Sequence, residues 1–311
     1  PLTLSSGDDH SIAGTVFTPT APTGLLIISH GMAEHGDRYQ SLARWLCERG
    51  MAVITFHHRG HGPNSGVENL GHYADQNGWA SVLADLHQVV QHARSQFPGL
   101  PVNLLGHSHG GPTVRYVASV YPDYVASATA VAGPHTGARM ADVLLGLQEA
   151  LPLTGNVIGN IVNAATGFLD LISGGGYDQD SLAALYSLST PGSTEFNSHY
   201  PEGLPEDACG HAPEVADNGV RYYSWSGAKP LTNVLDISDA GMGLLALLYL
   251  GEKNDGLVSS CSSHLGLVIR DDYRMNHLDE VNQIAGLVSP FETNPTAVFR
   301  QHANRLKNRG L

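Results

Sequence analysis

The stretch VNLLGHSHGGPTVRYVASV, residues 102–120, decides the fold. It opens with the apolar run Val102 to Leu105, which is typical of a buried strand, and residues 112–120 have the spacing of a helix. Between them lies a Gly-x-Ser-x-Gly pattern centred on Ser108. Small residues there let the chain turn sharply and lift the Ser108 hydroxyl above the strand end. We therefore expect a nucleophile at this turn, against the plainer alternative of a glycine-rich turn without chemistry.

The flanking sequence repeats the same alternation of strand and helix. Apolar runs predict further strands over residues 25–29, 51–56 and 125–132, and helical spacing recurs over 39–46 and 79–97. Residues 2–16 alternate around a turn and predict a hairpin. Strands and helices that alternate in this way predict an α/β fold, with a mostly parallel sheet covered by helices on both faces. We expect one domain over residues 1–311, with an inserted cap over 137–190.

The composition is that of a compact globular protein. Of the 311 residues, 42% are apolar and 14% are charged, well below the roughly 25% charged of an average domain, so charge-driven disorder is excluded. A net charge of -13 argues against nucleic-acid binding, which needs a concentrated basic surface. The longest apolar run, Leu244 to Leu250, is far shorter than the roughly 20 residues that span a bilayer, so we expect no transmembrane helix.

A serine nucleophile needs an imidazole base and a carboxylate that orients it. In this kind of fold the three follow the chain order serine, acid, histidine. His277 is the best candidate for the base because Asp255 precedes it, in a loop just beyond the apolar run 244–250, which we expect to be a strand. The alternatives that the sequence leaves open are His264 as the base and Asp236 or Asp239 as the acid.

Acyl transfer also needs hydrogen-bond donors for the negative oxygen of its tetrahedral intermediate. The loop after the first parallel strand, His30-Gly31-Met32, is placed to supply one donor. We expect the backbone N–H groups of Met32 and of His109, the residue after the nucleophile, to form this oxyanion hole. The plainer reading of His30-Gly31 is an ordinary tight turn.

From Gly106 onward the sequence resembles the secreted true lipases of the Pseudomonas and Burkholderia type, members of the α/β-hydrolase superfamily. The matching stretches are GHSHGGPTVRYVASVYPD, AGPHTG, GVRYYSWSG, PLTNVLD, NDGLVSSCSSHLGLVIRDDYRMNHLDEVNQ and RQHANRLKN. The resemblance implies an α/β-hydrolase fold and a Ser108, Asp255, His277 triad. It also implies a structural Ca²⁺ held by Asp236, Asp279 and the carbonyl oxygens of Gln283 and Leu287, and a disulfide between Cys209 and Cys261, which leaves Cys47 as a free core thiol.

Residues 1 to about 105 resemble instead the monoacylglycerol lipase and lysophospholipase branch of the same superfamily. The stretches LLIISHGMAEHGDRYQSLARWLCERG, HHRGHG and NGWASVLADLHQVVQHARSQFPGLPVNLLGHS carry this likeness. We therefore expect a hybrid chain with a seam at residues 105–108. The first half also gathers His57, His58 and His61, but no metal-ligand spacing is present and zinc is not expected.

Residues 151–174 resemble the family's lid helix. They present a wide apolar face at helical spacing, which either closes over the site and opens at an oil surface or belongs to a plain core helix. The leading hypothesis is a triacylglycerol lipase that works through an acyl-enzyme at a lipid-water interface. The alternatives are a monoacylglycerol lipase or soluble carboxylesterase without interfacial activation, and an inert lipid-binding scaffold.

The expected partner and cellular location depend on which of the two resemblances applies to the whole protein. The second half implies a lipase-specific foldase chaperone as a candidate partner and a secreted protein. The first half implies a cytoplasmic one. Acylglycerols or other esters are the expected substrates in either case.

Overall fold

The structure is a computed structural model that describes residues 1–32, 34–62, 65, 71–74, 77–146, 159–161, 163–165, 167, 185–283 and 286–311. The strands are β1 (Leu2–Ser5), β2 (Ser11–Phe17), β3 (Gly24–Ser29), β4 (Met51–Phe56), β5 (Val102–His107), β6 (Ser127–Val131), β7 (Arg221–Gly227) and β8 (Leu267–Tyr273). The α-helices are α1 (Gln40–Cys47), α2 (Gly78–Gln96), α3 (Gly110–Val120), α4 (Arg139–Leu144), α7 (Thr190–His199), α8 (Ser238–Leu245) and α9 (Pro295–Asn308). Short 3₁₀ helices are η1 (Gly36–Tyr39), η3 (Pro122–Tyr124), η4 (Ala246–Tyr249), η5 (Cys261–Ser263) and η6 (Asp279–Val281).

The strands form one sheet in the order β1-β2-β4-β3-β5-β6-β7-β8. The predicted hairpin is confirmed, since β1 and β2 pair antiparallel with Leu2 opposite Gly14. Strand β2 also runs antiparallel to β4, and the pairs from β4 to β8 are parallel. Strands β3 and β5 are neighbours, with Ser29 opposite Gly106. The loops that follow these two strands therefore leave the sheet side by side.

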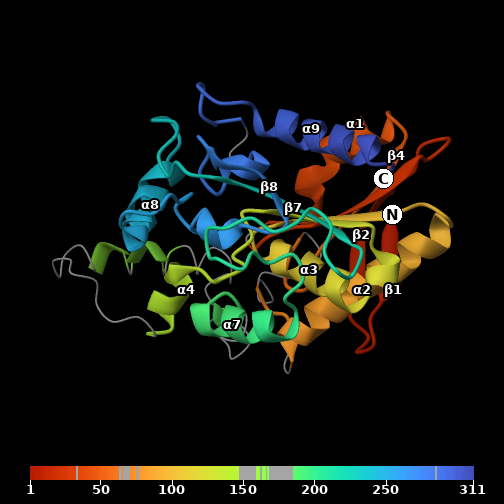
Figure 1. Cartoon of the computed structure of the whole chain (residues 1–311), viewed down its shortest axis with the longest axis horizontal. Helices are drawn as coiled ribbons and strands as arrows, with labels where there is room; N and C mark the ends of the chain where they lie inside the picture. The colour runs from red at the N-terminus through yellow and green to blue at the C-terminus, as the bar shows by residue number, and fades with distance from the viewer. Residues whose placement is uncertain are drawn as a thin grey trace.

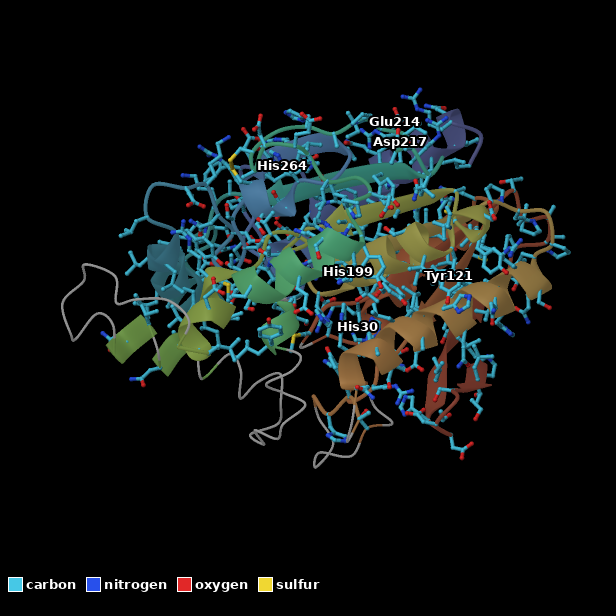
Figure 2. The ribbon with its side chains drawn as sticks, turned by 60° about the horizontal axis from the view of Figure 1, so that its bottom comes forward. His30, Tyr121, His199, Glu214, Asp217 and His264 are labelled. Atoms are coloured by element: carbon cyan, nitrogen blue, oxygen red, sulfur yellow. A yellow bond between two sulfur atoms is a disulfide. The ribbon has the colours of Figure 1, made fainter. Side chains whose placement is uncertain are left out.

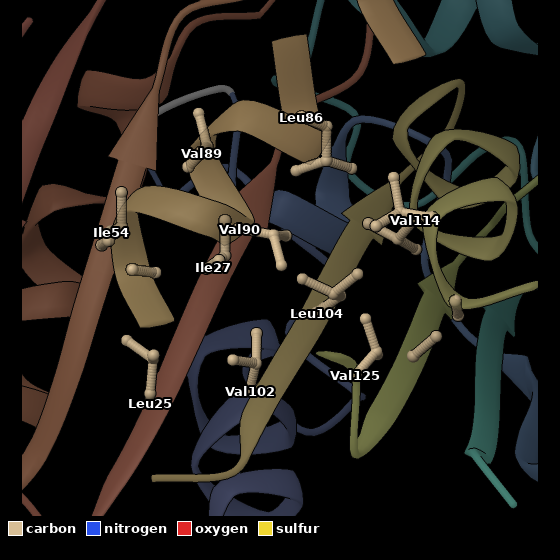
Figure 3. Packing of buried hydrophobic residues seen from close by; sticks show 14 of the residues in the cluster. Leu25, Ile27, Ile54, Leu86, Val89, Val90, Val102, Leu104, Val114 and Val125 are labelled. Carbon is tan, nitrogen blue, oxygen red and sulfur yellow. The ribbon is translucent and has the colours of Figure 1, made fainter. Parts of the chain in front are cut away.

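Alternate side chains of the central strands enter two separate cores. Leu25 and Ile27 pack with residues of α2 and α3, whereas Leu26 and Ile28 pack with residues of α1 and α9. Figure 1 shows α1 and α9 on one side of the sheet and α2 and α3 on the other, and Figure 3 shows the first core between strand and helix. Because both faces are covered, these strands read as continuous apolar runs. The predicted fold class is confirmed.

One predicted element is wrong. The run Leu244 to Leu250 was expected to be a strand, but it forms the end of α8 and the 3₁₀ helix η4. Leu245, Leu248 and Tyr249 bury themselves in a third core with Met140 of α4. A short, fully apolar run has no periodicity that separates a buried strand from a buried helix.

The cap predicted over 137–190 lies largely outside the described residues, as does most of the lid segment 151–174. Its described pieces are helical at residues 159–161, 163–165 and 167. Ile161 and Ala165 are buried against Met140 and Met242, which gives this part of the segment a packed apolar face. Among the described helices, none is both long and apolar enough to cross a bilayer.

Candidate active site

Ser108 occupies a sharp turn between β5 and α3. Its φ is +53°, in the left-handed region that side-chain-bearing residues rarely adopt, so the turn is strained. The glycines around it are needed for space, because a Cβ on Gly106 would overlap the carbonyl oxygen of Gly110, and one on Gly110 would overlap that of Ser29. This is the geometry that exposes a nucleophile at the top of a parallel sheet.

The predicted acid and base are bonded to each other. His277 Nδ1 donates to Asp255 Oδ2 over 2.8 Å, since an ionised carboxylate can only accept. The other oxygen, Asp255 Oδ1, accepts the backbone N–H groups of Leu257 at 2.9 Å and Val258 at 2.7 Å. Asp255 is fully buried and His277 nearly so. These bonds hold the Asp255 carboxylate in place. Because Asp255 engages Nδ1 of His277, the other ring nitrogen, Nε2, is available to accept a proton from a serine hydroxyl.

The alternative acids and base are engaged elsewhere. His264 bonds to the carbonyl oxygen of Gly210 and to Asp271, and Figure 2 shows it well apart from His30, whose loop carries the predicted oxyanion donor. Asp239 accepts from Asn276, and Asp236 accepts from Ser238. Neither aspartate bonds to His277 in the described part of the chain. The geometry therefore favours Asp255 and His277.

His277 contacts His107, the residue that precedes the predicted nucleophile Ser108. His107 Nε2 lies 3.2 Å from the carbonyl oxygen of His277, and the two rings are 4.7 Å apart. Within the described residues the structure records no hydrogen bond between Ser108 Oγ and His277 Nε2. Catalytic hydrogen bonds are often long before substrate binds, so this last contact of the triad stays a prediction.

The predicted oxyanion loop packs directly on the nucleophile. A Cβ built on Gly31 would lie 2.8 Å from Ser108 Cβ and 3.1 Å from the carbonyl oxygen of His107. The amides of Met32 and His109 have no acceptor in the described residues. Two unpaired donors next to one serine are what an oxyanion hole requires, and this role for Met32 and His109 stays a prediction.

A buried charge network behind Ser108 was missed by sequence reasoning. His107 Nδ1 contacts Glu34 Oε1, and the Tyr39 hydroxyl donates to Glu34 Oε2 at 2.7 Å. Burial favours the uncharged form of both partners, but their attraction outweighs it. The Glu34 carboxylate, together with Glu280, raises the pKa of His107 to about 10, and His107 lowers that of Glu34 to about 2. The sequence signal was the presence of two acids close to the predicted site, Glu34 just after Met32 and Glu280 just after His277.

Glu280 completes this network from the other side. Its Oε2 lies 3.7 Å from His107 Nε2 and has no hydrogen-bond partner, while its Oε1 accepts the amide of Gly227. Burial, followed by the neighbouring Asp255, raises the pKa of Glu280 to about 7. The ligand-type atoms of His107, His277 and Glu280 lie within 4.8 Å of one another and could hold a metal ion.

The four residues proposed from sequence as calcium ligands are partly brought together. Asp236 Oδ2 and Asp279 Oδ1 are both buried without a hydrogen-bond partner. Burial, with the charges of Asp239 and Asp236, raises the pKa of Asp279 to about 6. Two orphaned carboxylate oxygens that repel each other fit a divalent cation. The carbonyl oxygen of Gln283 accepts from Arg38 at 2.9 Å, and the part of Leu287 in this site stays a prediction.

The predicted disulfide is present between Cys209 and Cys261. Cys261 begins η5, six positions after Asp255, and Cys209 lies in the long segment before β7. The bond therefore ties the loop after Asp255 to a distant part of the chain. Cys47 is free, as expected, but it is half-buried at the end of α1 rather than a core thiol.

Comparison with known proteins gives consistent relatives. A family model described as serine aminopeptidase, S33 matches residues 20–184. The chain is 55% identical to a triacylglycerol lipase of Vibrio cholerae over 211 residues, 68% of this chain and 67% of that protein. It is 36% identical to a triacylglycerol lipase of Burkholderia plantarii over 283 residues, 81% of this chain and 78% of that protein. The mature lipase BlEst2 of Bacillus licheniformis shares the fold, with a TM-score of 0.57 at 15% identity over 94% of this chain and 98% of that one.

These findings do not support the hybrid chain expected from the sequence. The family model runs through residues 105–108 without a break, and the Burkholderia lipase aligns with 81% of the chain. Each of these two matches extends over residues on both sides of the proposed seam at 105–108. The protein is thus a serine hydrolase with the α/β-hydrolase fold, and it belongs to the triacylglycerol lipases of the Pseudomonas, Burkholderia and Vibrio type.

Proposed function

We propose that this protein hydrolyses triacylglycerols with Ser108 as nucleophile, His277 as general base and Asp255 as the acid that orients His277. The proposal is supported by the strained turn at Ser108 and by the bonded His277–Asp255 pair, whose His277 contacts His107, the residue before Ser108. A lone imidazole could not hold the tautomer that leaves Nε2 free, and the buried carboxylate fixes it.

The reaction follows from these positions. His277 Nε2 takes the proton of Ser108 as its oxygen attacks the ester carbonyl, and Asp255 stabilises the imidazolium that forms. The amides of Met32 and His109 then hold the developing oxyanion, each worth about 3 kcal/mol of the barrier. His277 passes its proton to the departing alcohol, and water activated by the same base releases the fatty acid.

The residues that would hold Ca²⁺ are Asp236 and Asp279, with the carbonyl oxygens of Gln283 and Leu287. When bound, the ion supplies charge neutralisation and a fixed geometry rather than a reacting group. Asp279 lies two residues after His277, so these ligands would set the path of the loop that carries the base.

We further propose that the protein acts at a lipid-water interface outside the cell. The disulfide supports an oxidising compartment. The segment 137–190 is proposed as the cap that opens at the interface, and a foldase chaperone as a partner in folding. A protein that instead prefers monoacylglycerols or soluble esters would show no rate increase when its substrate exceeds its solubility limit.

The experiment is hydrolysis of emulsified triacylglycerol and of p-nitrophenyl esters by Ser108→Ala. Activity should fall by several powers of ten on both substrates, because triad residues act as a unit. A fluorophosphonate probe should label the wild type and not this variant. Ser198→Ala, at an exposed position of α7, is the matched control and should retain activity. Activity of Ser108→Ala within tenfold of the wild type would refute the assignment.

A further inference from the structure

A cavity of about 520 Å³ lies between the first turns of α2, helix α3 and helix α7. Its lining is mostly apolar and aromatic, with Trp79 and Leu83 from α2, Pro112 from α3, and Phe196 from α7. Figure 2 places His199, a further lining residue, on α7. The volume and the lining are those of a small-molecule site, in which a few polar groups set the specificity.

Two charged groups line this cavity: Glu195, which is exposed, and Arg115, whose side chain is fully buried. Its Nη2 donates to Asn197 Oδ1, but Nε and Nη1 have no hydrogen-bond partner. The ring of Phe196 lies 4.8 Å from its Cζ. Among the described residues, no carboxylate lies within ion-pair distance of Arg115, and Glu202 acts on it only from farther away. A buried guanidinium with two unpaired nitrogens is costly without an anion.

His135 is a further buried polar group in the lining. Neither of its ring nitrogens has a hydrogen-bond partner, and burial, together with Arg115, keeps its pKa low, so the ring is neutral. Asn197 connects the two groups, because its Nδ2 donates to the carbonyl oxygen of His135 over 2.8 Å. Burial lowers the pKa of Arg115 to about 9, so it remains a cation at neutral pH. The wall of the cavity thus contains a buried positive charge and a buried neutral imidazole, both with unpaired nitrogens, in a largely apolar surrounding.

The cavity adjoins the nucleophile through His109. The ring of Trp79 lies 4.4 Å from that of His109, and Ser187, which also lines the cavity, has its Oγ 3.2 Å from His109 Nε2. The residue that follows Ser108 therefore contacts the cavity wall.

We propose that the cavity binds a fatty-acid carboxylate, with Arg115 and His135 holding the carboxylate and the apolar lining holding the chain. A carboxylate matches the planar fork of a guanidinium, and the alkyl chain matches the aromatic walls. That the occupant is the enzyme's own product rests on the proposed function. The carboxylate site itself does not, and a fatty acid from the medium would bind there equally.

The test uses the full chain carrying Ser108→Ala, so that no turnover occurs, and titration calorimetry with octanoate and 1-octanol. Octanoate should bind at least tenfold more tightly than the alcohol. Adding Arg115→Met, which removes the charge and keeps an unbranched apolar chain, should abolish this preference. Adding Arg49→Met, at an exposed arginine of the α1 end, should leave it unchanged. Equal affinity for octanoate and octanol, or an unchanged octanoate affinity with Arg115→Met, overturns the proposal.

Arg115→Met could fail to fold, and circular dichroism would reveal such a defect. A second variant therefore tests the proposal without changing Arg115. Ala80→Trp, at an exposed position of the lining, should narrow the cavity and weaken octanoate binding at least tenfold without touching Arg115. Undiminished binding in this variant shows that octanoate binds elsewhere. In the wild type, added octanoate should slow ester hydrolysis if the product occupies the site. Failure of the lipase assignment itself is read separately, from retained hydrolysis in Ser108→Ala.

Discussion

Ser108 adopts a left-handed backbone conformation in a tight turn, and this turn has room only because several neighbouring residues are glycines without a side chain. Gly106 and Gly110 make room within the turn, and Gly31 makes room from the adjacent strand end. The third of these contacts joins the nucleophile to its expected oxyanion donor at Met32. The precision of the site therefore depends on the absence of one methyl group at residue 31.

Gly31→Ala should consequently lower kcat by about a hundredfold, the cost of displacing one oxyanion donor, while the protein stays folded. The new Cβ would lie 2.8 Å from Ser108 Cβ and would push the loop away. Esterase kinetics with a melting curve check this. Gly7→Ala, where a Cβ would meet nothing within 4 Å, is the control and should change neither. Full kcat in Gly31→Ala would show that the loop has no part in catalysis.

The Glu34–His107 pair predicts a pH window of stability. The pKa of Glu34 is lowered to about 2, so its contribution is present above its unfolded value of about 4.5 and is lost as pH falls through 2. The pKa of His107 is raised to about 10, so its contribution is present below about 6.5 and is lost as pH rises through 10. The pair stabilises fully between pH 4.5 and 6.5.

Glu34→Gln should therefore cost the most free energy of unfolding in that window, about 3 kcal/mol, and less at pH 3 and pH 9. Denaturant unfolding of both proteins at the three pH values measures this difference. Glu48→Gln, at an exposed glutamate, should show no such dependence. A constant difference across the three pH values would mean that Glu34 and His107 do not form an ion pair.

The sequence was informative about these residues in unequal ways. Ser108, Asp255 and His277 could be predicted as a triad because a turn motif and a chain order mark them. Glu34 and Glu280 could not, because an acid becomes functional here only when tertiary packing buries it against an imidazole. In the sequence alone, Glu34 and Glu280 cannot be distinguished from acidic residues that are exposed to solvent.

At the scale of elements, the parallel strands β3, β4, β5 and β6 were predicted to within about two residues because their burial on both faces leaves uninterrupted apolar runs, whereas β7 and β8 were not predicted. The same signal misled at residues 244–250, where an equally apolar run packs as a helix end against α4. The residue pattern alone does not predict that the segment before α8 lies close to η6, and only the resemblance to known lipases suggested it. That arrangement brings Asp236, just before α8, to Asp279, the first residue of η6.

If a cation joins these two elements, Ca²⁺ should stabilise the protein by about 3 kcal/mol at a hundredfold excess over its Kd, and a chelator should lower the melting temperature and the activity. Asp236→Asn should abolish the response to Ca²⁺ because it removes one of the two orphaned carboxylates. Asp217→Asn, at an exposed aspartate, should retain it. If Ca²⁺ and chelator leave the melting temperature and the activity of the wild type unchanged, the proposed calcium site is wrong.

At the scale of the whole molecule, apolar side chains gather on the exposed segment between β7 and α8. Val234 is 100% exposed, Leu235 73% and Ile237 92%, and Leu231 is exposed beside them. A group of large apolar side chains exposed to solvent on one segment is typical of a surface that contacts another apolar phase. If the protein acts at a lipid-water interface, as proposed above, that phase would be the lipid, and the segment would insert its side chains while the site stays in the water layer.

Ile237→Asp should therefore lower the rate on emulsified triacylglycerol at least tenfold, because it places a charge where the segment enters the lipid. The rate on a dissolved short-chain ester should stay within twofold, since Ile237 is 92% exposed and supports no core. Val215→Asp, at an exposed valine away from this segment, is the matched control and should affect neither rate. Binding to triacylglycerol emulsions by sedimentation separates adsorption from catalysis. Equal losses on both substrates would place Ile237 in the folded framework rather than at the interface.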